Sequence, residues 1–262
     1  MRPGIRIIAA AAVALAAGGA LAQQAAAPRG YLGPERWPDA AKILSGPPAA
    51  GSAEEKQQLA VYRALRKLEG TPRWALAQND LPTGPPQMLT NFSCAVGAQL
   101  TPQTAPRLTT LLGKVGLDAG PQVASVKDVF KRPRPYQIED GTICTEKSAA
   151  LAASPDYPSG HATWGWVIGL ILSELAPDRA TPILVRARAF GESRVVCGVH
   201  TPGAVEAGRT NGSALFAVLQ ADPQFRADLE AARAEVAAAR KAGPPPGDRC
   251  ATEAEVLAKN PY

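Results

Sequence analysis

The sequence predicts an all-α protein built as one compact helical domain. Apolar residues recur at spacings of three and four over most of the chain, which is the pattern of amphipathic helices. Prolines and glycines separate these segments, and the alternation of apolar and polar residues typical of strands is hardly visible. About 240 residues follow the leader described next, which is enough for one well-buried core.

The first 22 residues have the pattern of a secretory signal peptide. Arg2 and Arg6 form a short basic region, and an apolar run of residues 7–21 follows. The segment Ala20–Ala22 matches a small-x-small cleavage site, so we expect cleavage after Ala22. The alternative is a membrane anchor, but the apolar run is short and rich in alanine and glycine. We therefore expect a periplasmic or secreted protein.

The rest of the chain indicates neither a membrane span nor a nucleic-acid partner. Residues 163–175 are apolar, but they are too few to span a bilayer and include Glu174, so we expect no stable membrane insertion after cleavage. The formal net charge is +5, and two of these charges lie in the leader. The basic residues are spread along the chain, with one local cluster at residues 127–134. A nucleic-acid binder would show a longer basic stripe.

We expect three segments in the chain: the signal peptide (1–22), an extended arm rich in proline and glycine (23–50) and the helical domain (51–262). Trp37, Ile43 and Leu44 are candidates for fixing the arm to the domain surface.

The predicted helices are defined by capping residues at their starts, by apolar residues along one face, and by glycines and prolines at their ends. Ser52 and Glu55 form a capping box for the first helix, and Gly70 with Pro72 ends it. Asp222 caps the last helix, and Gly243 follows its end. Between these two, we predict helices over residues 88–98, 104–117, 123–131, 162–176, 180–192 and 203–219, with a loop over 132–160. Gly120 and Pro121 are expected to end the helix over 104–117.

Four cysteines, Cys94, Cys144, Cys197 and Cys250, predict two disulfides, because their number is even and the compartment is oxidising. Three pairings are possible, and we favour Cys94–Cys144 with Cys197–Cys250. A buried, unbridged Cys197 is the alternative. The spacing of cysteine and histidine matches no zinc motif, and we expect no metal and no cofactor.

The residues that indicate chemistry are the only two histidines and three cations. They fall in three separate stretches of the sequence, which contain Lys127 with Arg134, then His161, then Arg194 with His200. Arginine offers a planar fork for two oxygens and lysine a point charge, so this set suits phosphate.

The segment from Ser159 to His161 adds a second device for binding an anion. It leads into a predicted helix, whose free N–H groups and dipole favour negative charge. Gly160 lets the backbone approach closely, and the Ser159 hydroxyl can donate a hydrogen bond. Taken singly, Ser159 is as well explained as a helix cap.

The other elements of the set also have structural explanations when each is taken singly. Lys127 can be a solvated surface residue, and Arg134 can belong to a structural ion pair. Arg194 can pair with Glu192 or Glu206 on the surface. The joint pattern therefore carries the functional prediction.

Three motifs combine these residues: Lys127…Arg134-Pro135, then Pro158-Ser159-Gly160-His161, then Ser193-Arg194…His200. Their order resembles the signature of the type 2 phosphatidic acid phosphatase superfamily. The resemblance extends over roughly residues 38–220 to the secreted bacterial class A non-specific acid phosphatases, with stretches such as "RARAFGESRVVCGVH" and "VEAGR".

The resemblance implies an all-α fold of the type shared with vanadium haloperoxidases, and metal-independent hydrolysis of small phosphomonoesters. It implies that His200 is the nucleophile, forming a phosphohistidine, and that His161 is the general acid and then the base. Lys127, Arg134 and Arg194 would neutralise the phosphoryl oxygens, with Ser159 and the Gly160 N–H. A homodimer is also expected from the resemblance.

This chain differs from the family pattern at the position of the residue that, in the family, orients the nucleophile. The family carries an aspartate four residues after the nucleophilic histidine, and this chain has Ala204. Glu206 would face the opposite side of a helix, and Glu192 precedes the motif, so we identify no replacement in the sequence. A backbone carbonyl can also hold a ring N–H. A smaller departure is Ala162, where the family usually carries a hydroxyl.

Three functions therefore remain open on the sequence. The first, which we favour, is an acid phosphatase, with turnover weakened if nothing replaces the missing carboxylate. The second is a weakly active or non-catalytic phosphate-binding relative. The third is a vanadate-dependent haloperoxidase, which uses the same kind of anion site. A membrane lipid phosphatase is disfavoured by the missing spans.

Overall fold

The computed structural model describes residues 28–262, and the predicted signal peptide with its cleavage site lies outside them. Over this range the chain forms helices and no strand, which confirms the all-α prediction. The α-helices are α1 (Ala40–Ile43), α2 (Ala53–Leu65), α3 (Pro72–Asn79), α4 (Pro85–Val96), α5 (Pro106–Phe130), α6 (Pro135–Ile138), α7 (Ala149–Ala153), α8 (Gly160–Leu175), α9 (Ala180–Val196), α10 (Pro202–Leu219), α11 (Pro223–Ala242) and α12 (Arg249–Leu257). Short 3-10 turns occur at Pro34–Arg36, Arg66–Leu68 and Pro177–Arg179.

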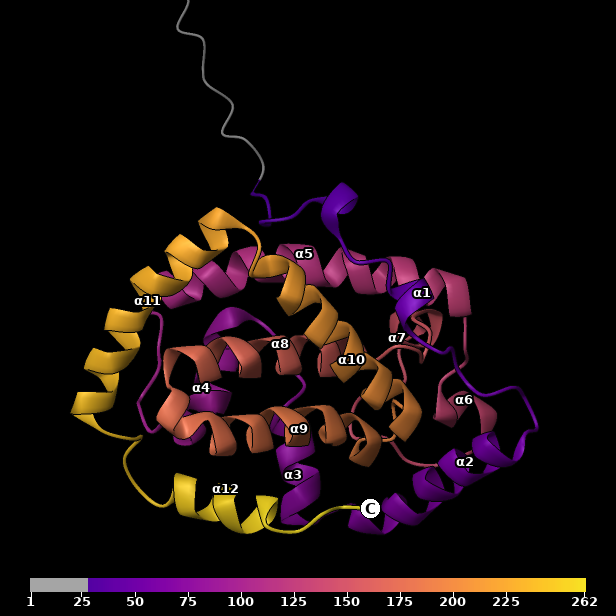
Figure 1. Ribbon diagram of the computed structural model, residues 1–262. Helices are drawn as coiled ribbons and strands as arrows, with labels where there is room; N and C mark the ends of the chain where they lie inside the picture. The colour runs from indigo at the N-terminus through magenta and orange to yellow at the C-terminus, as the bar shows by residue number, and fades with distance from the viewer. Residues whose placement is uncertain (1–27) are drawn as a thin grey trace, which may run out of the picture.

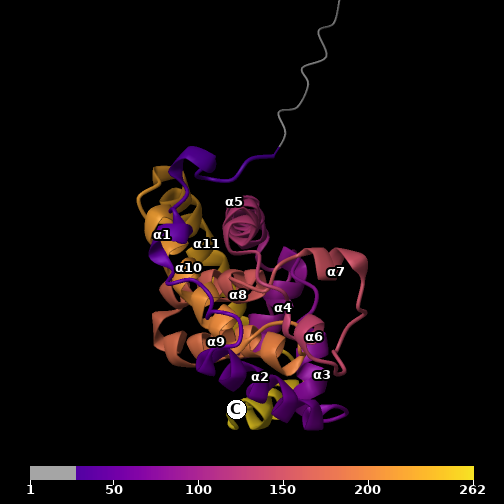
Figure 2. The same ribbon diagram turned by 90° about the vertical axis from the view of Figure 1, so that its right-hand side faces the viewer.

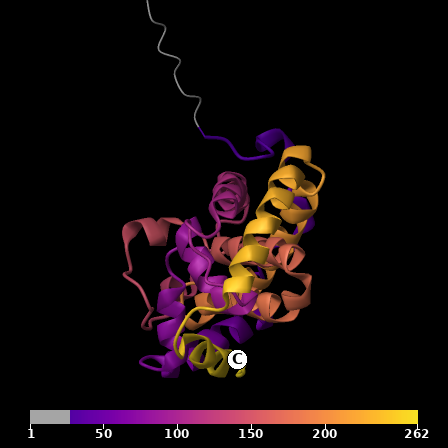
Figure 3. The same ribbon diagram turned by 90° about the vertical axis from the view of Figure 1, so that its left-hand side faces the viewer.

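Helices α8 and α9 form the centre of the molecule, and α10 packs across them (Figure 1). Helix α5 lies along one side of this centre, while α3 and α12 lie on the opposite side. Figure 2 shows α6 and α7 projecting on the side away from α1 and α11. Figure 3 shows α11 running along the face that α6 and α7 leave free, with α12 below it. The N-terminal ends of α8 and α10 and the C-terminal ends of α5 and α9 carry the residues discussed below.

Helix α8 is apolar on nearly all sides because neighbouring helices surround it. Close approach depends on glycine at two contacts. A Cβ at Gly169 would lie 2.5 Å from the Ala187 Cβ on α9, and one at Gly208 on α10 would lie 2.5 Å from the Ser159 carbonyl. Ala162 is fully buried against Gly208, so the small side chain there serves packing. In the described part of the chain, no helix is long and apolar enough to cross a membrane.

The prediction of two helices over 104–117 and 123–131 was wrong, because α5 runs without a break from Pro106 to Phe130. Pro121 lies inside it. A proline cannot bond to the carbonyl four residues earlier, here that of Leu117. Leu117 is 41 % exposed, so this face of the helix is open to water, which can satisfy the free carbonyl.

Short helices interrupt segments that we predicted as loops or as helix ends. Pro72 does not only stop α2: Thr71 caps the N–H of Trp74, and Pro72 opens α3 at its first position. Helices α6 and α7 occur in the predicted loop of residues 132–160, and α12 follows the helix that we expected to be last. At α11 the prediction is confirmed, since the Asp222 side chain accepts from the Phe225 N–H.

Two disulfides form, but the pairing that we favoured was wrong. The bonds are Cys94–Cys250 and Cys144–Cys197. The end of α9 lies beside the loop after α6, where the Cys144 N–H donates to the Cys197 carbonyl at 3.0 Å. Helix α12 folds back against α4, which brings the α-carbons of Cys94 and Cys250 to 5.2 Å. Neither proximity has a local signal in the sequence.

A buried carboxylate on α5 holds the N-terminal arm. Asp118 is 1 % exposed and accepts from the backbone N–H groups of Tyr31, Leu32 and Gly33, the shortest at 2.6 Å. It also accepts from the Trp37 indole at 3.1 Å. Of the three residues that we expected to fix the arm, Leu44 is buried and Trp37 packs against the core, whereas Ile43 is 47 % exposed.

Replacing Asp118 with alanine is expected to destabilise the protein by about 3 kcal/mol, because several donors lose a charged acceptor in a site with little water. Urea unfolding measures the loss as a lower midpoint at an unchanged slope. Asp128→Ala, at an exposed position of the same helix, is the matched control. Equal midpoints for the two variants would contradict this role of Asp118.

Candidate active site

The five cations and histidines predicted from sequence lie at one end of the helical bundle. Lys127 lies in the last turn of α5, Arg134 is the N-cap of α6, and Arg194 lies in the last turn of α9. His161 lies in the first turn of α8, and His200 lies just before α10. Helix ends from distant parts of the chain therefore bring the three motifs together.

The turn that ends α9 sets the spacing between Arg194 and His200. Gly198 adopts the left-handed conformation (φ 81°), which lets the chain fold back after the helix. The backbone N–H groups of Val199 and His200 then donate to the Arg194 carbonyl at 3.1 and 3.3 Å. Arg66 donates to the Val196 carbonyl at 2.7 Å and so closes the helix end.

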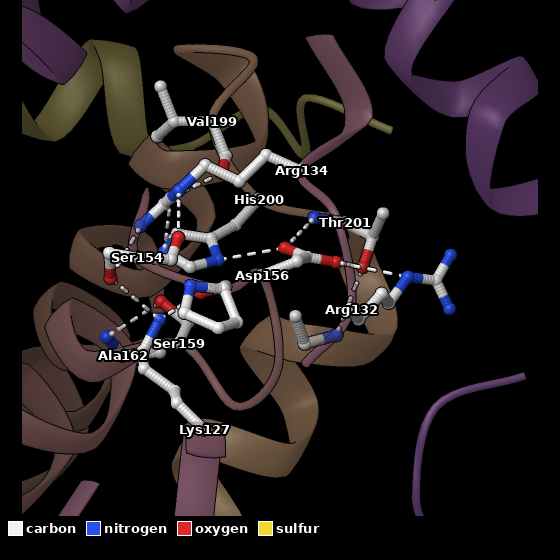
Figure 4. A network of polar contacts seen from close by, with 12 residues as sticks. Lys127, Arg132, Arg134, Ser154, Asp156, Ser159, Ala162, Val199, His200 and Thr201 are labelled. Carbon is white, nitrogen blue, oxygen red and sulfur yellow. Dashed lines mark hydrogen bonds and ion pairs between the residues drawn. The ribbon is translucent and has the colours of Figure 1, made fainter. Parts of the chain in front are cut away.

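The ring of His200 is held from both sides (Figure 4). Its Nδ1 lies 2.8 Å from Asp156 Oδ1, and its Nε2 lies 3.0 Å from Arg134 Nη1. A guanidinium can only donate hydrogen bonds, so Nε2 is the acceptor and carries no proton. Nδ1–H therefore donates to Asp156. The lone pair of Nε2, the atom a nucleophile needs, is on the side of the cations.

Asp156 is the functional residue that sequence reasoning missed. It is fully buried and also accepts from the Thr201 N–H at 3.1 Å and the Thr201 hydroxyl at 2.7 Å. Arg132 Nε forms an ion pair with its other oxygen at 3.3 Å. Burial raises the pKa of Asp156, and the hydrogen bonds from Thr201 oppose that rise. The one signal in the sequence is its place, two residues before the Pro-Ser-Gly-His motif.

His161 has the opposite arrangement of ring nitrogens. Its Nε2 lies 3.0 Å from the Leu81 carbonyl, which can only accept, so Nε2 carries the proton. The ring stacks on Phe190, with ring centroids 6.0 Å apart. Its Nδ1 is thereby left free to exchange a proton with a bound molecule. A backbone carbonyl does hold a histidine ring here, as we considered for His200, but it holds the other histidine.

One loop positions two of the cations. Arg134 donates from Nε to the Ser154 carbonyl at 2.7 Å and from Nη1 to the Val199 carbonyl at 2.7 Å. Lys127 Nζ donates to the Pro155 carbonyl and lies 3.4 Å from the Ser154 hydroxyl (Figure 4). The segment just before Asp156 thus fixes both side chains.

Arg194 differs from the other cations because its donors are not used by the described protein. It is 3 % exposed, and its Nε and Nη1 have no hydrogen-bond partner among residues 28–262. Burying unpaired guanidinium donors is costly, so the site is built for an acceptor that the chain does not supply. Ser159 caps α8 by accepting from the Ala162 N–H at 3.3 Å, which leaves its hydroxyl proton free to donate.

The charges in the site act on one another. Burial lowers the pKa of His200 well below its ordinary value, and the positive charges of Arg134 and Lys127 lower it further. Burial and Arg194 do the same to His161. Both rings are therefore neutral in this arrangement at neutral pH. Among residues 28–262, no cluster of three or more His, Cys, Asp or Glu side chains has the form of a metal site.

An apolar groove of about 330 Å³ adjoins His161. Its lining includes Trp164 and Gly160 on α8 and Gly113, Gly116 and Gly120 on α5. His161 is its only ionisable lining residue. The groove is therefore suited to an uncharged organic group beside a histidine that can transfer a proton.

Comparison with known proteins agrees with this geometry. The family model described as PAP2 superfamily matches residues 107–227, which include all three motifs. An acid phosphatase of Zymomonas mobilis subsp. mobilis is 38 % identical over 206 residues, covering 78 % of each chain. The chain belongs to the PAP2 superfamily. Non-specific acid phosphatases of Providencia stuartii and Salmonella typhimurium are 33 % and 32 % identical, over 80 % and 79 % of this chain and 86 % and 83 % of their own.

The structure shows what surrounds Ala204, the position at which this chain differs from the PAP2 pattern. Ala204 is fully buried in an apolar cluster with Leu44, Val126 and Tyr157. A carboxylate at this position would therefore be placed beside a buried apolar cluster. The sequence identified no replacement for the missing acid, and in the structure Asp156, from another part of the chain, lies 2.8 Å from His200 Nδ1.

Proposed function

We propose that this protein is an acid phosphatase that hydrolyses phosphomonoesters in two steps, through a phosphohistidine at His200 and without a metal. The observation that carries the proposal is the buried Arg194, whose free donors lie in a site with Lys127, Arg134 and two histidines of opposite tautomers. The relatives that are named acid phosphatases support the phosphatase activity. The vanadate-dependent haloperoxidase has no comparable support.

In the first step the phosphoryl group binds among the three cations. The Arg134 Nη1–H that His200 Nε2 accepts is redirected to a phosphoryl oxygen, which frees the Nε2 lone pair. The lone pair of His200 Nε2 attacks phosphorus, and the bond from phosphorus to the ester oxygen breaks. Protonated His161 gives its Nδ1 proton to the leaving oxygen, so an alcohol departs into the apolar groove. The cations and the Gly160 N–H stabilise the charge on the phosphoryl oxygens.

In the second step a water molecule attacks the phosphohistidine. His161, now neutral, takes a proton from the water at Nδ1, and the bond from phosphorus to His200 Nε2 breaks. Inorganic phosphate leaves, and His161 regains the protonation state that it had at the start. The two histidines thus need different protonation states in the same step.

The substrate supplies the charge that makes this possible. Without an anion, burial holds the pKa of His161 low, and the positive charges of the cations, Arg194 first, lower it further. A bound phosphoryl dianion offsets the positive charges, which raises the pKa of His161 and favours the acid form. Mildly acidic solution favours the same form, so we propose that activity is highest there. The proposed site of action is the periplasm, to which the signal peptide expected at residues 1–22 would direct the chain.

The catalytic efficiency kcat/KM is expected to fall as pH rises through about 7, because burial and Arg134 lower the pKa of Lys127 to about 7. Above that pKa the ammonium loses its proton and with it the attraction for phosphate. The pH profile of kcat/KM reports groups of the free enzyme and checks this directly. In Lys127→Gln the fall of kcat/KM near pH 7 should vanish. Lys131→Gln, at an exposed position four residues away, should retain it. An unchanged profile in Lys127→Gln would contradict the assignment.

Hydrolysis of p-nitrophenyl phosphate by the mature chain, with and without EDTA, tests the proposed function. Turnover that persists in EDTA is the expected result. Activity abolished by EDTA would overturn the metal-free mechanism. Binding of phosphate or vanadate without turnover would instead identify a phosphate-binding relative.

A further inference from the structure

We infer that Asp156 is the positioning residue for His200, in the role that the resembling family gives to an acid four residues after its nucleophile. The inference rests on the proposed function, since it concerns how the nucleophile is held. It assigns a role to a residue outside the three motifs. It also means that the change to Ala204 relocates the carboxylate without removing it.

The geometry at the His200 ring places a carboxylate on one nitrogen and a cation on the other. Asp156 Oδ1 lies 2.8 Å from His200 Nδ1, while Arg134 occupies Nε2. The two contacts require the same tautomer, with the proton on Nδ1. A carboxylate in this place also stabilises the positive charge that develops on the ring when Nε2 bonds to phosphorus.

Asp156 is itself held by several hydrogen bonds. Thr201 donates to both of its oxygens, from the backbone to Oδ1 and from the hydroxyl to Oδ2. The Asp156 N–H donates to the Arg132 carbonyl at 2.8 Å. Thr201 also caps α10, so the carboxylate, the ring and the start of α10 form one unit.

The other acids near the third motif have different partners. Glu206 pairs with Arg209, and its side chain is 63 % exposed. Glu192 lies 3.6 Å from Arg188 along α9. Position 204 faces an apolar cluster. Of these candidates, Asp156 alone reaches the ring.

The protein contains only two histidines, which makes the inference directly measurable. In untagged protein labelled with ¹⁵N-histidine, long-range ¹H–¹⁵N spectra distinguish protonated from unprotonated ring nitrogens. We expect His200 as the Nδ1–H tautomer and His161 as the Nε2–H tautomer. The wild-type spectrum alone overturns the inference if His200 carries its proton on Nε2.

The matching variant is Asp156→Asn, which keeps the shape and removes the charge. We expect kcat to fall on the order of 10²–10⁴-fold, by analogy with loss of the carboxylate in a catalytic triad. The inhibition constant of inorganic phosphate should change by no more than about threefold, because the cations are untouched. The His161 resonances should stay in place, which a general loss of structure would not allow. Asp128→Asn serves as the control.

The outcomes separate this inference from the proposed function. If the wild type hydrolyses phosphomonoesters, His200→Ala does not, and Asp156→Asn keeps wild-type kcat, then the inference on Asp156 fails and the proposed function stands. If the wild type has no phosphatase activity, the proposed function fails, and the catalytic role of Asp156 fails with it.

Discussion

Replacing His200 with alanine is expected to reduce kcat on the order of 10⁴–10⁶-fold, as removal of a nucleophile does in other covalent mechanisms. The physical reason is that His200 Nε2 is an unprotonated ring nitrogen 3.0 Å from Arg134, within the cation cluster, whereas the mechanism uses the unprotonated Nδ1 of His161 for proton transfer. Steady-state hydrolysis of p-nitrophenyl phosphate measures the loss. Inorganic phosphate should still bind, because Lys127, Arg134 and Arg194 remain.

The control for this variant is its stability. His200 contacts Asp156 and Arg134, so removing the ring leaves two buried charges with one partner fewer. Urea unfolding and phosphate binding of His200→Ala therefore need to be measured beside kcat. A folded variant that binds phosphate and retains more than a tenth of wild-type kcat would contradict the assignment of the nucleophile.

Replacing His161 with asparagine is expected to affect substrates unequally. A general acid matters most when the leaving oxygen is basic, and such catalysis contributes about 10²–10⁴-fold. Hydrolysis of an alkyl phosphate should therefore lose the full factor. Hydrolysis of p-nitrophenyl phosphate should lose much less in the first step, because nitrophenolate leaves without a proton.

The comparison of kcat/KM for these two substrates checks the role of His161, because kcat/KM covers the steps through cleavage of the ester. Phe190→Leu is a matched control: it alters the stacking beneath the ring and keeps the proton donor. It should slow both substrates by a similar factor. Equal losses for both substrates in His161→Asn would indicate that the ring acts in binding and not as the acid.

Most of the fold follows from local patterns. The first turns of α2 and α11 follow from Ser52 and Asp222, whose side chains cap the predicted helix starts. The buried helix α8 follows from its apolar composition. The break expected at Pro121 did not occur. The carbonyl that Pro121 leaves without a partner belongs to Leu117, which is exposed, and this exposure depends on the tertiary position and not on the local sequence.

The candidate site also combines residues that the sequence predicts with a residue that it does not. The three motifs identified both histidines and three of the cations at the site, but not Arg132, which pairs with Asp156. The partner of His200 lies 44 residues from it in the chain, in a loop held by Thr201 and Arg132. No spacing rule connects these positions, and the disulfide pairing escaped prediction for the same reason. Contacts of this kind depend on how helix ends meet in space.

The most direct test of the central claim is to locate the phosphoryl group during turnover. The mature protein is mixed with a phosphomonoester labelled in its phosphoryl group, quenched within the first turnovers, digested and analysed by mass spectrometry. The mechanism predicts the label on Nε2 of His200, at up to one group per chain, and none in His200→Ala. Label on another residue, or hydrolysis with no labelled protein at any quench time, would contradict it.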